Sequence, residues 1–292
     1  MHIPVLSKEV IEVLNPREGE FFIDGTVDGG GHAVAILEKI MPGGKFLGLD
    51  WDKKMIKNFK KKIIGYNFPN NKIILINENF KNIPMILKNK KLGKADGLLL
   101  DLGFSSEQLE SSGRGFSFKK DEPLIMTYSD SQRPVREWLE LLKEFELAWI
   151  IYKFGEERYA RRIARAIKNN LPIQTSKKLA ELIEKVLPKN YERGRIHPAT
   201  RTFQALRIFA NEEIENIKEL LLKINDVVNV GGRLAVITFH SIEDRLVKNI
   251  FRNLAKEKKV EILTKKPIQP SQREVRLNPR CRSAKLRALK VL

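Results

Sequence analysis

The amino-acid sequence predicts an α/β protein with a doubly wound, mostly parallel sheet and an inserted all-helical subdomain. Short apolar runs alternate with helical patterns through the first hundred residues, which is typical of consecutive βαβ units. Roughly 130 residues of mainly helical pattern then separate the fourth predicted strand from the fifth, far more than an ordinary crossover connection needs. A chain of 292 residues is long enough for one large α/β domain with such an insertion.

The predicted strands are short apolar runs bounded by Gly, Asn or Asp turn signals. They span residues 21–26, 45–49, 73–76, 97–100 and 233–239, followed by 261–264 and 285–291 near the end of the chain. We expect the last two runs to pair antiparallel at the edge of the sheet.

Apolar side chains recur at three-to-four-residue spacing between residues 132 and 187, which predicts a series of helices. We assign residues 106–196 to a helical substrate-recognition subdomain, and residues 1–105 with 197–292 to the sheet-containing domain. Thr175 or Ser176 suits the N-cap of the last helix in the insertion. A long amphipathic stretch then returns the chain to the sheet, and the sequence Asn211-Glu212-Glu213 predicts a break in it.

Charge and cysteine content narrow the class of protein. Lys and Arg number 54 against 36 Asp and Glu, a formal net charge of +18, which favours a polyanionic partner such as nucleic acid. A general bias toward lysine is the alternative explanation. The single cysteine, Cys281, excludes an intrachain disulfide, as is typical of a reducing compartment. With no basic leader and no bilayer-length apolar run, we expect a cytoplasmic protein without a membrane partner.

A glycine-rich loop, Asp24-Gly25-Thr26-Val27-Asp28-Gly29-Gly30-Gly31-His32, follows the first predicted strand and precedes a helical pattern. In this position glycines let the backbone approach a bound nucleotide closely, although a tight turn alone would explain any one of them. Asp50 stands at the end of the second strand, where a carboxylate can accept hydrogen bonds from ribose hydroxyls. The combination predicts a nucleotide-like ligand.

Acidic side chains in and near this loop favour one ligand class over another. Asp28 would repel the diphosphate of a dinucleotide, whereas Asp24 and Asp28 are compatible with a cationic sulfonium and an α-amino group. This pattern favours S-adenosylmethionine over NAD. Asp101 ends the fourth strand and should face the same crevice, where it could bind the cofactor or orient an acceptor amine. Capping the following turn is the structural alternative for Asp101.

Longer motifs extend along nearly the whole chain. They are His2-Ile3-Pro4-Val5-Leu6, Asp24-Gly25-Thr26, Gly29-Gly30-Gly31-His32, Asp101-Leu102-Gly103, Ser105-Ser106, Gln108-Leu109, Arg114-Gly115-Phe116-Ser117-Phe118, Gly155-Glu156-Glu157-Arg158, Arg162-Ile163-Ala164-Arg165, His197-Pro198-Ala199-Thr200-Arg201, Phe239-His240-Ser241-Ile242-Glu243-Asp244 and Asn278-Pro279-Arg280-Cys281-Arg282. Together they resemble the MraW family, the bacterial small-subunit ribosomal RNA methyltransferases H.

The resemblance implies a Rossmann-like class I methyltransferase fold. It also implies transfer of a methyl group from S-adenosyl-L-methionine to the exocyclic N4 of one cytidine, C1402, in the decoding region of 16S rRNA within the small ribosomal subunit. The cofactor pocket that it implies comprises Gly30, Gly31, His32, Asp50, Phe80, Asp101 and Gln108. The sequence is compatible with a homodimer and does not decide between naked RNA and an assembled subunit as substrate.

Two positions depart from the pattern of the family. Where the family has Pro-Leu-Asp-Met-Arg-Met, residues 123–128 read Pro-Leu-Ile-Met-Thr-Tyr, without the acid or the arginine, and Asp28 replaces a usual glycine. The first departure removes two polar groups near the expected substrate cleft. It therefore bears on acceptor contacts or rate more than on cofactor binding.

Methylation of a cytosine amine needs an acceptor for its proton. The N4 lone pair is delocalised into the ring, so an acid beside the methyl group would hold the amino protons and later take up the released one. The candidates are Asp101 and the group His240, Glu243 and Asp244, which follows the fifth strand. A hydrogen-bonded structural role is the alternative for His240. No metal is expected, because no second His or Cys stands at ligand spacing.

Phosphate contacts are expected from arginines of the insertion, of the returning stretch and of the C-terminal segment. They are Arg114, Arg158, Arg162, Arg165, Arg201, Arg207, Arg280 and Arg282. A solvated helix face, or a pair with a neighbouring Glu, is the alternative for each. Two other functions stay open at this point: a nicotinamide-dependent oxidoreductase on the same fold, and a non-catalytic ribosome-assembly factor suggested by the altered residues 125–128.

Overall fold

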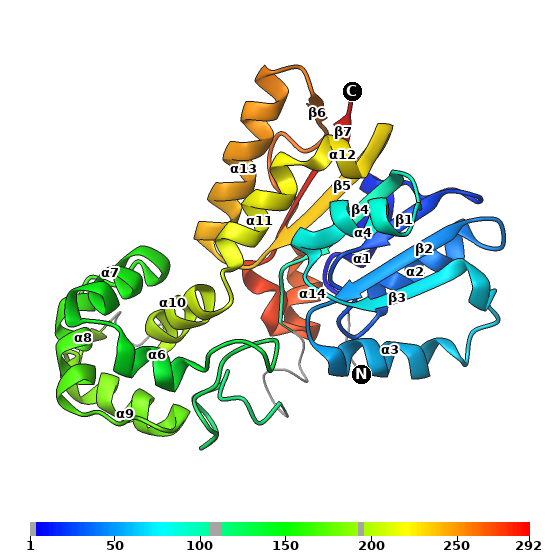
Figure 1. Cartoon of the computed structure of the whole chain (residues 1–292). Coiled ribbons are helices and arrows are strands. Elements are labelled where there is room, and N and C mark those ends of the chain that lie inside the picture. Colours follow the sequence, from blue (N-terminus) through cyan, green and yellow to red (C-terminus); the bar gives the residue numbers. More distant parts are fainter. Residues whose placement is uncertain (1–3, 105–111, 192–195) are drawn as a thin grey trace. The chain divides into compact units, whose positions relative to one another are not determined.

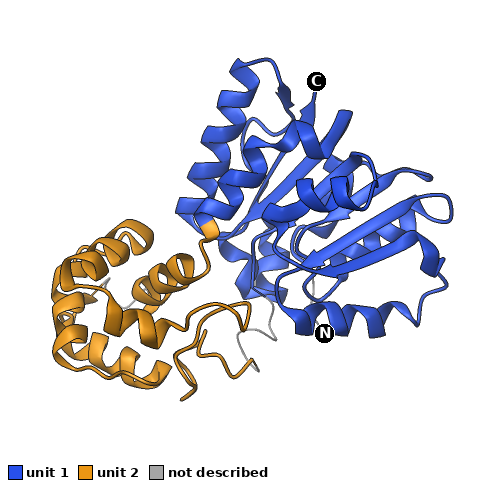
Figure 2. Ribbon diagram, in the orientation of Figure 1, with its two compact units in different colours: residues 1–104, 214–292 blue, residues 105–213 orange. Residues whose placement is uncertain are grey.

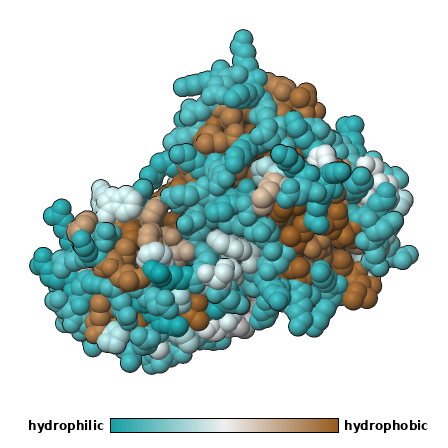
Figure 3. Space-filling view, in the orientation of Figure 1, coloured by the Kyte–Doolittle hydropathy of each residue, from teal (hydrophilic) through white to brown (hydrophobic). Residues whose placement is uncertain are grey.

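The computed structural model describes residues 4–104, 112–191 and 196–292, and the chain divides into two compact units. The first contains residues 1–104 and 214–292, and the second contains residues 105–213 (Figure 2). The hydrophilic surface of both is interrupted by hydrophobic areas (Figure 3). Among the described residues, no helix combines the length and the apolar character needed to cross a membrane.

The first unit is built on a seven-stranded sheet in the order β3-β2-β1-β4-β5-β7-β6. The strands are β1 (Phe21–Asp24), β2 (Lys45–Asp50), β3 (Ile73–Asn77), β4 (Ala95–Asp101), β5 (Val228–Thr238), β6 (Val260–Ile262) and β7 (Lys285–Val291). Strands β1 to β5 pair in parallel, and β7 runs antiparallel to both β5 and β6. The predicted α/β class and the antiparallel pairing of the last two strands are thus confirmed.

Helices cover both faces of this sheet (Figure 1). They are α1 (Ser7–Leu14), α2 (Gly31–Ile40), α3 (Lys53–Ile63), α4 (Ile83–Asn89), α11 (Glu213–Leu222), α12 (Ile224–Val227), α13 (Ser241–Lys256) and α14 (Gln272–Leu277), with 3-10 turns at Asn70–Lys72, Phe80–Asn82 and Pro279–Ser283. One core cluster joins the strands to α4, α11, α12 and α13, and another joins them to α1, α2 and α3. Strands β1, β2 and β4 contribute to both clusters and are buried on two sides, which explains their nearly continuous apolar sequences.

The second unit consists of helices and of a segment of turns. Its helices are α6 (Val135–Leu141), α7 (Glu144–Gly155), α8 (Ala160–Asn169), α9 (Ser176–Val186) and α10 (Thr200–Ala210). Thr175 caps α9 by accepting a hydrogen bond from the Lys178 N–H, as predicted. Between residues 112 and 134 the chain forms turns and one isolated bridge, Pro123 with Thr175.

Helix α10 belongs to this second unit. The sequence-based boundary ended the insertion at residue 196, whereas the compact unit extends to residue 213. The cause is close packing of α10 on α7: a Cβ at Gly155 would lie 2.6 Å from the Arg201 carbonyl oxygen, and the Gln204 side chain donates to the Phe154 carbonyl at 3.0 Å. Asn211 ends α10 and donates to the Met126 carbonyl at 2.8 Å, at the break that the sequence predicts.

We expect Gly97→Ala to destabilise the sheet. Gly97 in β4 lies directly opposite Phe22 in β1, and an added Cβ would lie 2.1 Å from the Phe22 ring. Overpacking of this kind costs about 1–3 kcal/mol, measurable by denaturant unfolding. Gly65→Ala is the matched control, because the nearest atom to its added Cβ is 3.7 Å away. Equal free energies of unfolding for the two variants would contradict this packing.

Candidate active site

Polar side chains gather at one edge of the sheet, where the five parallel strands end. Asp24, Asp50 and Asp101 are the last residues of β1, β2 and β4, Glu78 follows β3, and His240 follows β5. The carboxyl ends of parallel strands form the ligand crevice of an open α/β sheet. Topology therefore brings together groups as far apart in the sequence as Asp24 and His240.

The glycine-rich loop crosses this edge under close steric control. The Gly25 N–H donates to the Leu99 carbonyl at 2.9 Å, and the Val27 N–H donates to the Leu49 carbonyl at 2.8 Å. Gly30 has a φ of 70°, and a Cβ there would lie 2.2 Å from the Phe59 ring. Gly31 would similarly meet Pro4 at 2.9 Å. Packing within the chain thus requires glycine at both positions, whether or not a ligand also approaches them.

Asp24, His32 and Asp101 form a buried cluster beside the loop. The Thr26 hydroxyl accepts the Asp101 N–H at 2.7 Å, and Asp24 Oδ1 accepts the Thr26 N–H at 3.0 Å. His32 Nε2 lies 3.5 Å from Asp101 Oδ2. Burial, reinforced by the charge of Asp101, raises the pKa of Asp24 to about 6, against the lowering effect of the Thr26 hydrogen bonds and of His32.

Several buried polar atoms of this cluster make no hydrogen bond within the described residues. Among the described residues, Asp24 Oδ2 and both ring nitrogens of His32 have no hydrogen-bond partner, although their atoms are buried. Buried polar groups are almost always satisfied in a working protein. The arrangement therefore fits a ligand that carries donors and positive charge at this position.

Asp50 is held by the backbone on both sides. Its Oδ2 accepts the Asp28 N–H and its Oδ1 accepts the Asp52 N–H, each at 2.8 Å. Burial raises the pKa of Asp50 to about 7, and the two hydrogen bonds only partly oppose that rise. Asp28 adopts a left-handed φ of 46°, which Asp tolerates better than most residues and which explains the glycine usual in the family pattern.

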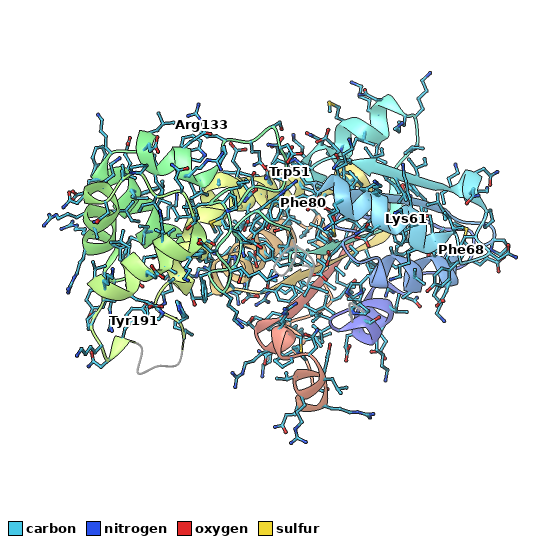
Figure 4. All side chains as sticks on the ribbon, turned by 90° about the horizontal axis from the view of Figure 1, so that it is seen from below. Trp51, Lys61, Phe68, Phe80, Arg133 and Tyr191 are labelled. Carbon is cyan, nitrogen blue, oxygen red and sulfur yellow. The ribbon has the colours of Figure 1, made fainter. Side chains whose placement is uncertain are left out.

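The end of β3 supplies an apolar and an amide group. Phe80 is half-buried, and a Cβ at Gly25 would lie 3.2 Å from the Phe80 Cβ. Asn79 is 2% exposed, its Oδ1 accepts the Lys81 N–H at 3.0 Å, and its Nδ2 has no partner among the described residues. Asn79 is not among the residues predicted for the pocket, although a polar residue soon after a predicted strand is a usable signal. Trp51 and Phe80, which follow β2 and β3, are labelled in Figure 4.

These groups fit the adenosine part of S-adenosylmethionine. The ionised Asp50 suits the ribose hydroxyls, the Asn79 Nδ2 donor suits a ring nitrogen of adenine, and Phe80 suits the apolar face of the base. Gln108, which the sequence analysis placed in the same pocket, lies outside the described residues.

His240 and Glu243 form the start of α13. His240 Nδ1 accepts the Glu243 N–H at 3.3 Å, and Glu243 Oε2 accepts the His240 N–H at 3.4 Å, a reciprocal cap of the helix N-terminus. Glu243 Oε2 also accepts the Phe239 N–H at 2.9 Å. His240 Nε2 also lies 2.9 Å from Glu243 Oε1. The carboxylate of Glu243 is 2% exposed and is occupied by its own helix. Glu243 and His240 Nδ1 thus stabilise the start of the helix, whereas His240 Nε2 is buried and has no hydrogen-bond partner among the described residues.

Asp244 is engaged in a buried ion pair. Arg287 of β7 donates to its two oxygens at 2.6 and 3.2 Å, and Lys285 approaches at 3.3 Å. Burial alone would raise the pKa of Asp244, but the Arg287 hydrogen bonds and charge outweigh burial and lower it. This pair fastens α13 to β7. Of the four predicted catalytic candidates, Asp101 alone has a carboxylate directed toward the loop and His32.

The eight arginines predicted to contact RNA fall into two groups. Arg114 donates to the carbonyls of Thr127 and Tyr128, and Arg207 forms a two-pronged pair with Glu213 at 2.8 and 2.9 Å. Arg201 donates to the Glu156 carbonyl at 3.0 Å. These three hold the second unit together.

The other five arginines expose their side chains. They are Arg158, Arg162, Arg165, Arg280 and Arg282. Arg165 lies 3.3 Å from Glu144, a surface pair of the kind that contributes little to stability and that a phosphate can replace. The exposed group is the one suited to an anionic partner.

The altered segment at residues 125–128 is well packed. Thr127 is 1% exposed, the Tyr128 hydroxyl donates to Glu213 at 3.2 Å, and the Tyr128 ring stacks on Phe116 with centroids 5.5 Å apart. Glu213 thereby links Tyr128 to Arg207. The replacement of the acid and the arginine is thus accommodated by a different set of internal contacts.

We expect Asp244→Asn to destabilise the first unit by about 3 kcal/mol, because it leaves the buried Arg287 without its counter-charge. The double variant Asp244→Leu/Arg287→Met should recover most of that loss. Since pairing lowers the pKa of Asp244, its contribution is present at neutral pH and is lost as pH falls through that lowered value. Denaturant unfolding of the single and double variants measures this, and equal losses in both would contradict a coupled pair.

The chain was compared with known proteins. The model of the MraW methylase family matches residues 1–292. A Thermotoga neapolitana protein named "Ribosomal RNA small subunit methyltransferase H" is 45% identical over 295 residues, covering 100% of this chain and 96% of the relative. Proteins of the same name from Fervidobacterium nodosum and Persephonella marina are 44% and 43% identical, covering 98% and 99% of this chain and 96% and 98% of their own.

Among solved structures, one from Clostridium thermocellum that is named as an rRNA methylase superposes with a TM-score of 0.50 at 13% identity and covers 100% of both chains. That likeness concerns the fold alone. The full-length match and the sequence identities above show the family. The chain belongs to the MraW methylase family and is a methyltransferase that uses S-adenosylmethionine.

Proposed function

We propose that this chain methylates the exocyclic N4 of cytidine C1402 in 16S ribosomal RNA, within the small ribosomal subunit. The observation that carries the proposal is the full-length match to relatives named as small-subunit ribosomal RNA methyltransferases H. The formal charge of +18 and the exposed arginines support an RNA substrate. Membership in a methylase family excludes the nicotinamide-dependent oxidoreductase.

The cofactor would be held by the polar edge of the sheet. Asp50, Asn79 and Phe80 suit the adenosine part, and the loop that contains Gly30 and Gly31 would pass close beside it. Asp24 suits the positively charged part, since a buried carboxylate with a spare oxygen is stabilised by a neighbouring cation. When bound, the cofactor supplies an activated methyl group on its sulfonium.

Asp101 would position the acceptor amine and receive its proton. Transfer of the methyl group to the amine nitrogen would leave that nitrogen with a proton to lose, and the Asp101 carboxylate would accept it. Asp101 Oδ2 faces His32 at 3.5 Å, while Oδ1 accepts the Gly103 N–H at 3.0 Å, so the carboxylate is fixed in orientation. A fixed acceptor lowers the barrier by alignment, and the burial of the cluster excludes water.

We expect Asp101→Asn to lower kcat for methyl transfer by about a hundredfold or more, because the amide cannot accept the amine proton. The assay uses labelled cofactor and small ribosomal subunits from a strain that lacks this enzyme, with mapping of the modified nucleotide. Asp226→Asn, an exposed change in the same unit, is the control. Tight cofactor binding by the natural protein without any methyl on C1402 would instead support the assembly-factor alternative.

Cofactor affinity should fall as pH drops below about 7. The pKa of Asp50 is raised to about 7, and its ionised form is the better acceptor for ribose hydroxyls, so protonation weakens binding. Titration calorimetry with S-adenosylhomocysteine between pH 8 and pH 6 measures this dependence. Asp50→Asn should bind more weakly at pH 8 and lose the pH response between pH 8 and pH 7, while the response of Asp24 near pH 6 remains. An unchanged pH response in that variant would show that another group titrates.

A further inference from the structure

Helix α7 exposes three aromatic side chains along one face. Phe145, Trp149 and Tyr152 are 68%, 53% and 65% exposed, and their spacing of four and three residues aligns them on the helix surface. We call these three residues the aromatic stripe. The opposite face of the helix is fully occupied, because Leu147, Ile151 and neighbouring residues are buried in the second unit.

An arginine row lies beside the stripe. Arg158 lies just before α8, and Arg161 and Arg162 lie in its first turn. All three are exposed, and with Phe145 and Trp149 they line a hollow with a volume of about 1220 Å³. Every residue that lines this hollow belongs to the second unit. Aromatic faces and guanidinium groups are thus presented together on one surface.

The acidic residues of the hollow are engaged elsewhere. Glu144 Oε1 lies 3.3 Å from Arg165, and Glu146 accepts the Lys143 N–H at 2.7 Å as part of the N-terminal cap of α7. Cations also lie over the aromatic rings: Lys153 Nζ is 4.2 Å from the Trp149 ring centre, and Arg158 is 5.0 Å from that of Tyr159. The surface therefore presents positive charge around aromatic faces.

We propose that the aromatic stripe and the arginine row bind an unpaired segment of RNA, with bases stacked on the rings and phosphates on the guanidinium groups. The proposal rests on the RNA substrate of the proposed function. Stacking on aromatic side chains combined with a positively charged groove is how proteins hold single strands without reading their sequence. The residues of this surface are distinct from Asp24, Asp50 and Asp101, which belong to the first unit.

Geometry favours an unpaired strand over a duplex. Along an α-helix, separations of four and three residues correspond to roughly 6 and 4.5 Å. Paired RNA is an A-form helix in which neighbouring bases are stacked on one another. Consecutive bases would therefore be splayed to meet successive rings, and bases inside a helix offer no free face. The arginine row favours RNA over a second copy of this chain, whose net charge of +18 would be repelled.

The test measures binding of the full-length protein to a short fluorescein-labelled oligouridine by anisotropy. Trp149→Ala should weaken binding at least about fivefold, and the triple change of Phe145, Trp149 and Tyr152 to Ala should weaken it further. Trp149→Phe should retain most of the affinity, because a phenyl ring still stacks. Leu141→Ala, at an apolar residue that is 59% exposed in the same unit, is the matched control and should bind as the natural protein does.

A salt series tests the arginine row separately. Removing one phosphate contact to a single strand reduces the slope of log affinity against log salt by about 0.7. Changing Arg158, Arg161 and Arg162 to Gln should therefore flatten the slope by about 2, whereas Trp149→Ala should lower affinity and leave the slope nearly unchanged. Identical slopes for the natural and triple-Gln proteins would overturn the assignment of phosphates to this row.

The remaining outcomes separate this surface from the methyl-transfer function. Undiminished oligouridine binding by the triple-Ala protein overturns the proposal. A natural protein that sediments as a dimer beside a monomeric triple-Ala protein would assign the stripe to contact between copies. If C1402 is not methylated by the natural protein while oligouridine binding still depends on Trp149, the proposed function fails and the surface stands. If the natural and triple-Ala proteins both methylate C1402 with equal KM for the ribosomal substrate, the proposed RNA-binding surface is wrong and the proposed function stands.

Discussion

The hydroxyl of Thr26 ties the active-site edge together. This hydroxyl accepts the Asp101 N–H at 2.7 Å, and the backbone N–H of Thr26 donates to Asp24 Oδ1 at 3.0 Å. The loop after β1 and the end of β4 therefore form one hydrogen-bonded unit. The Gly25 N–H bond to the Leu99 carbonyl extends the parallel pairing of those strands into the loop. The positions of the glycines, of His32 and of both carboxylates depend on this junction.

Unbalanced negative charge is the electrostatic signature of that edge. Burial raises the pKa of Asp24 and Asp50 to about 6 and about 7, and no lysine or arginine is among the causes that lower them. Asp244 shows the contrast, because Arg287 and Lys285 neutralise it and lower its pKa. An isolated buried carboxylate is costly to a fold and is retained where a ligand completes it. A sulfonium cofactor with two ribose hydroxyls meets that requirement.

The arginines illustrate why a charge excess cannot be converted directly into a binding surface. Arg114 donates to backbone carbonyls and Arg207 pairs with Glu213. Arg287 pairs with Asp244 inside the first unit. Exposed arginines in the second unit lie instead beside exposed aromatic rings. Exposed aromatic rings beside exposed arginines distinguish the proposed RNA-binding surface from a helix face that is only solvated.

Local sequence determined the strands, the helix start at Thr175, the break at Asn211 and the acids at the strand ends, because turn residues, apolar runs and caps act over a few residues. Only the tertiary structure decided which polar groups have partners. Asp244 and Arg287 are 43 residues apart, and no local sequence pattern predicts that they pair. Nor does a local pattern predict that Asn79 Nδ2 has no partner among the described residues. The same holds for α10, which belongs with α7 because a glycine allows their backbones to approach closely. Periodicity encodes elements, whereas partner choice depends on chain segments that meet only in the folded state.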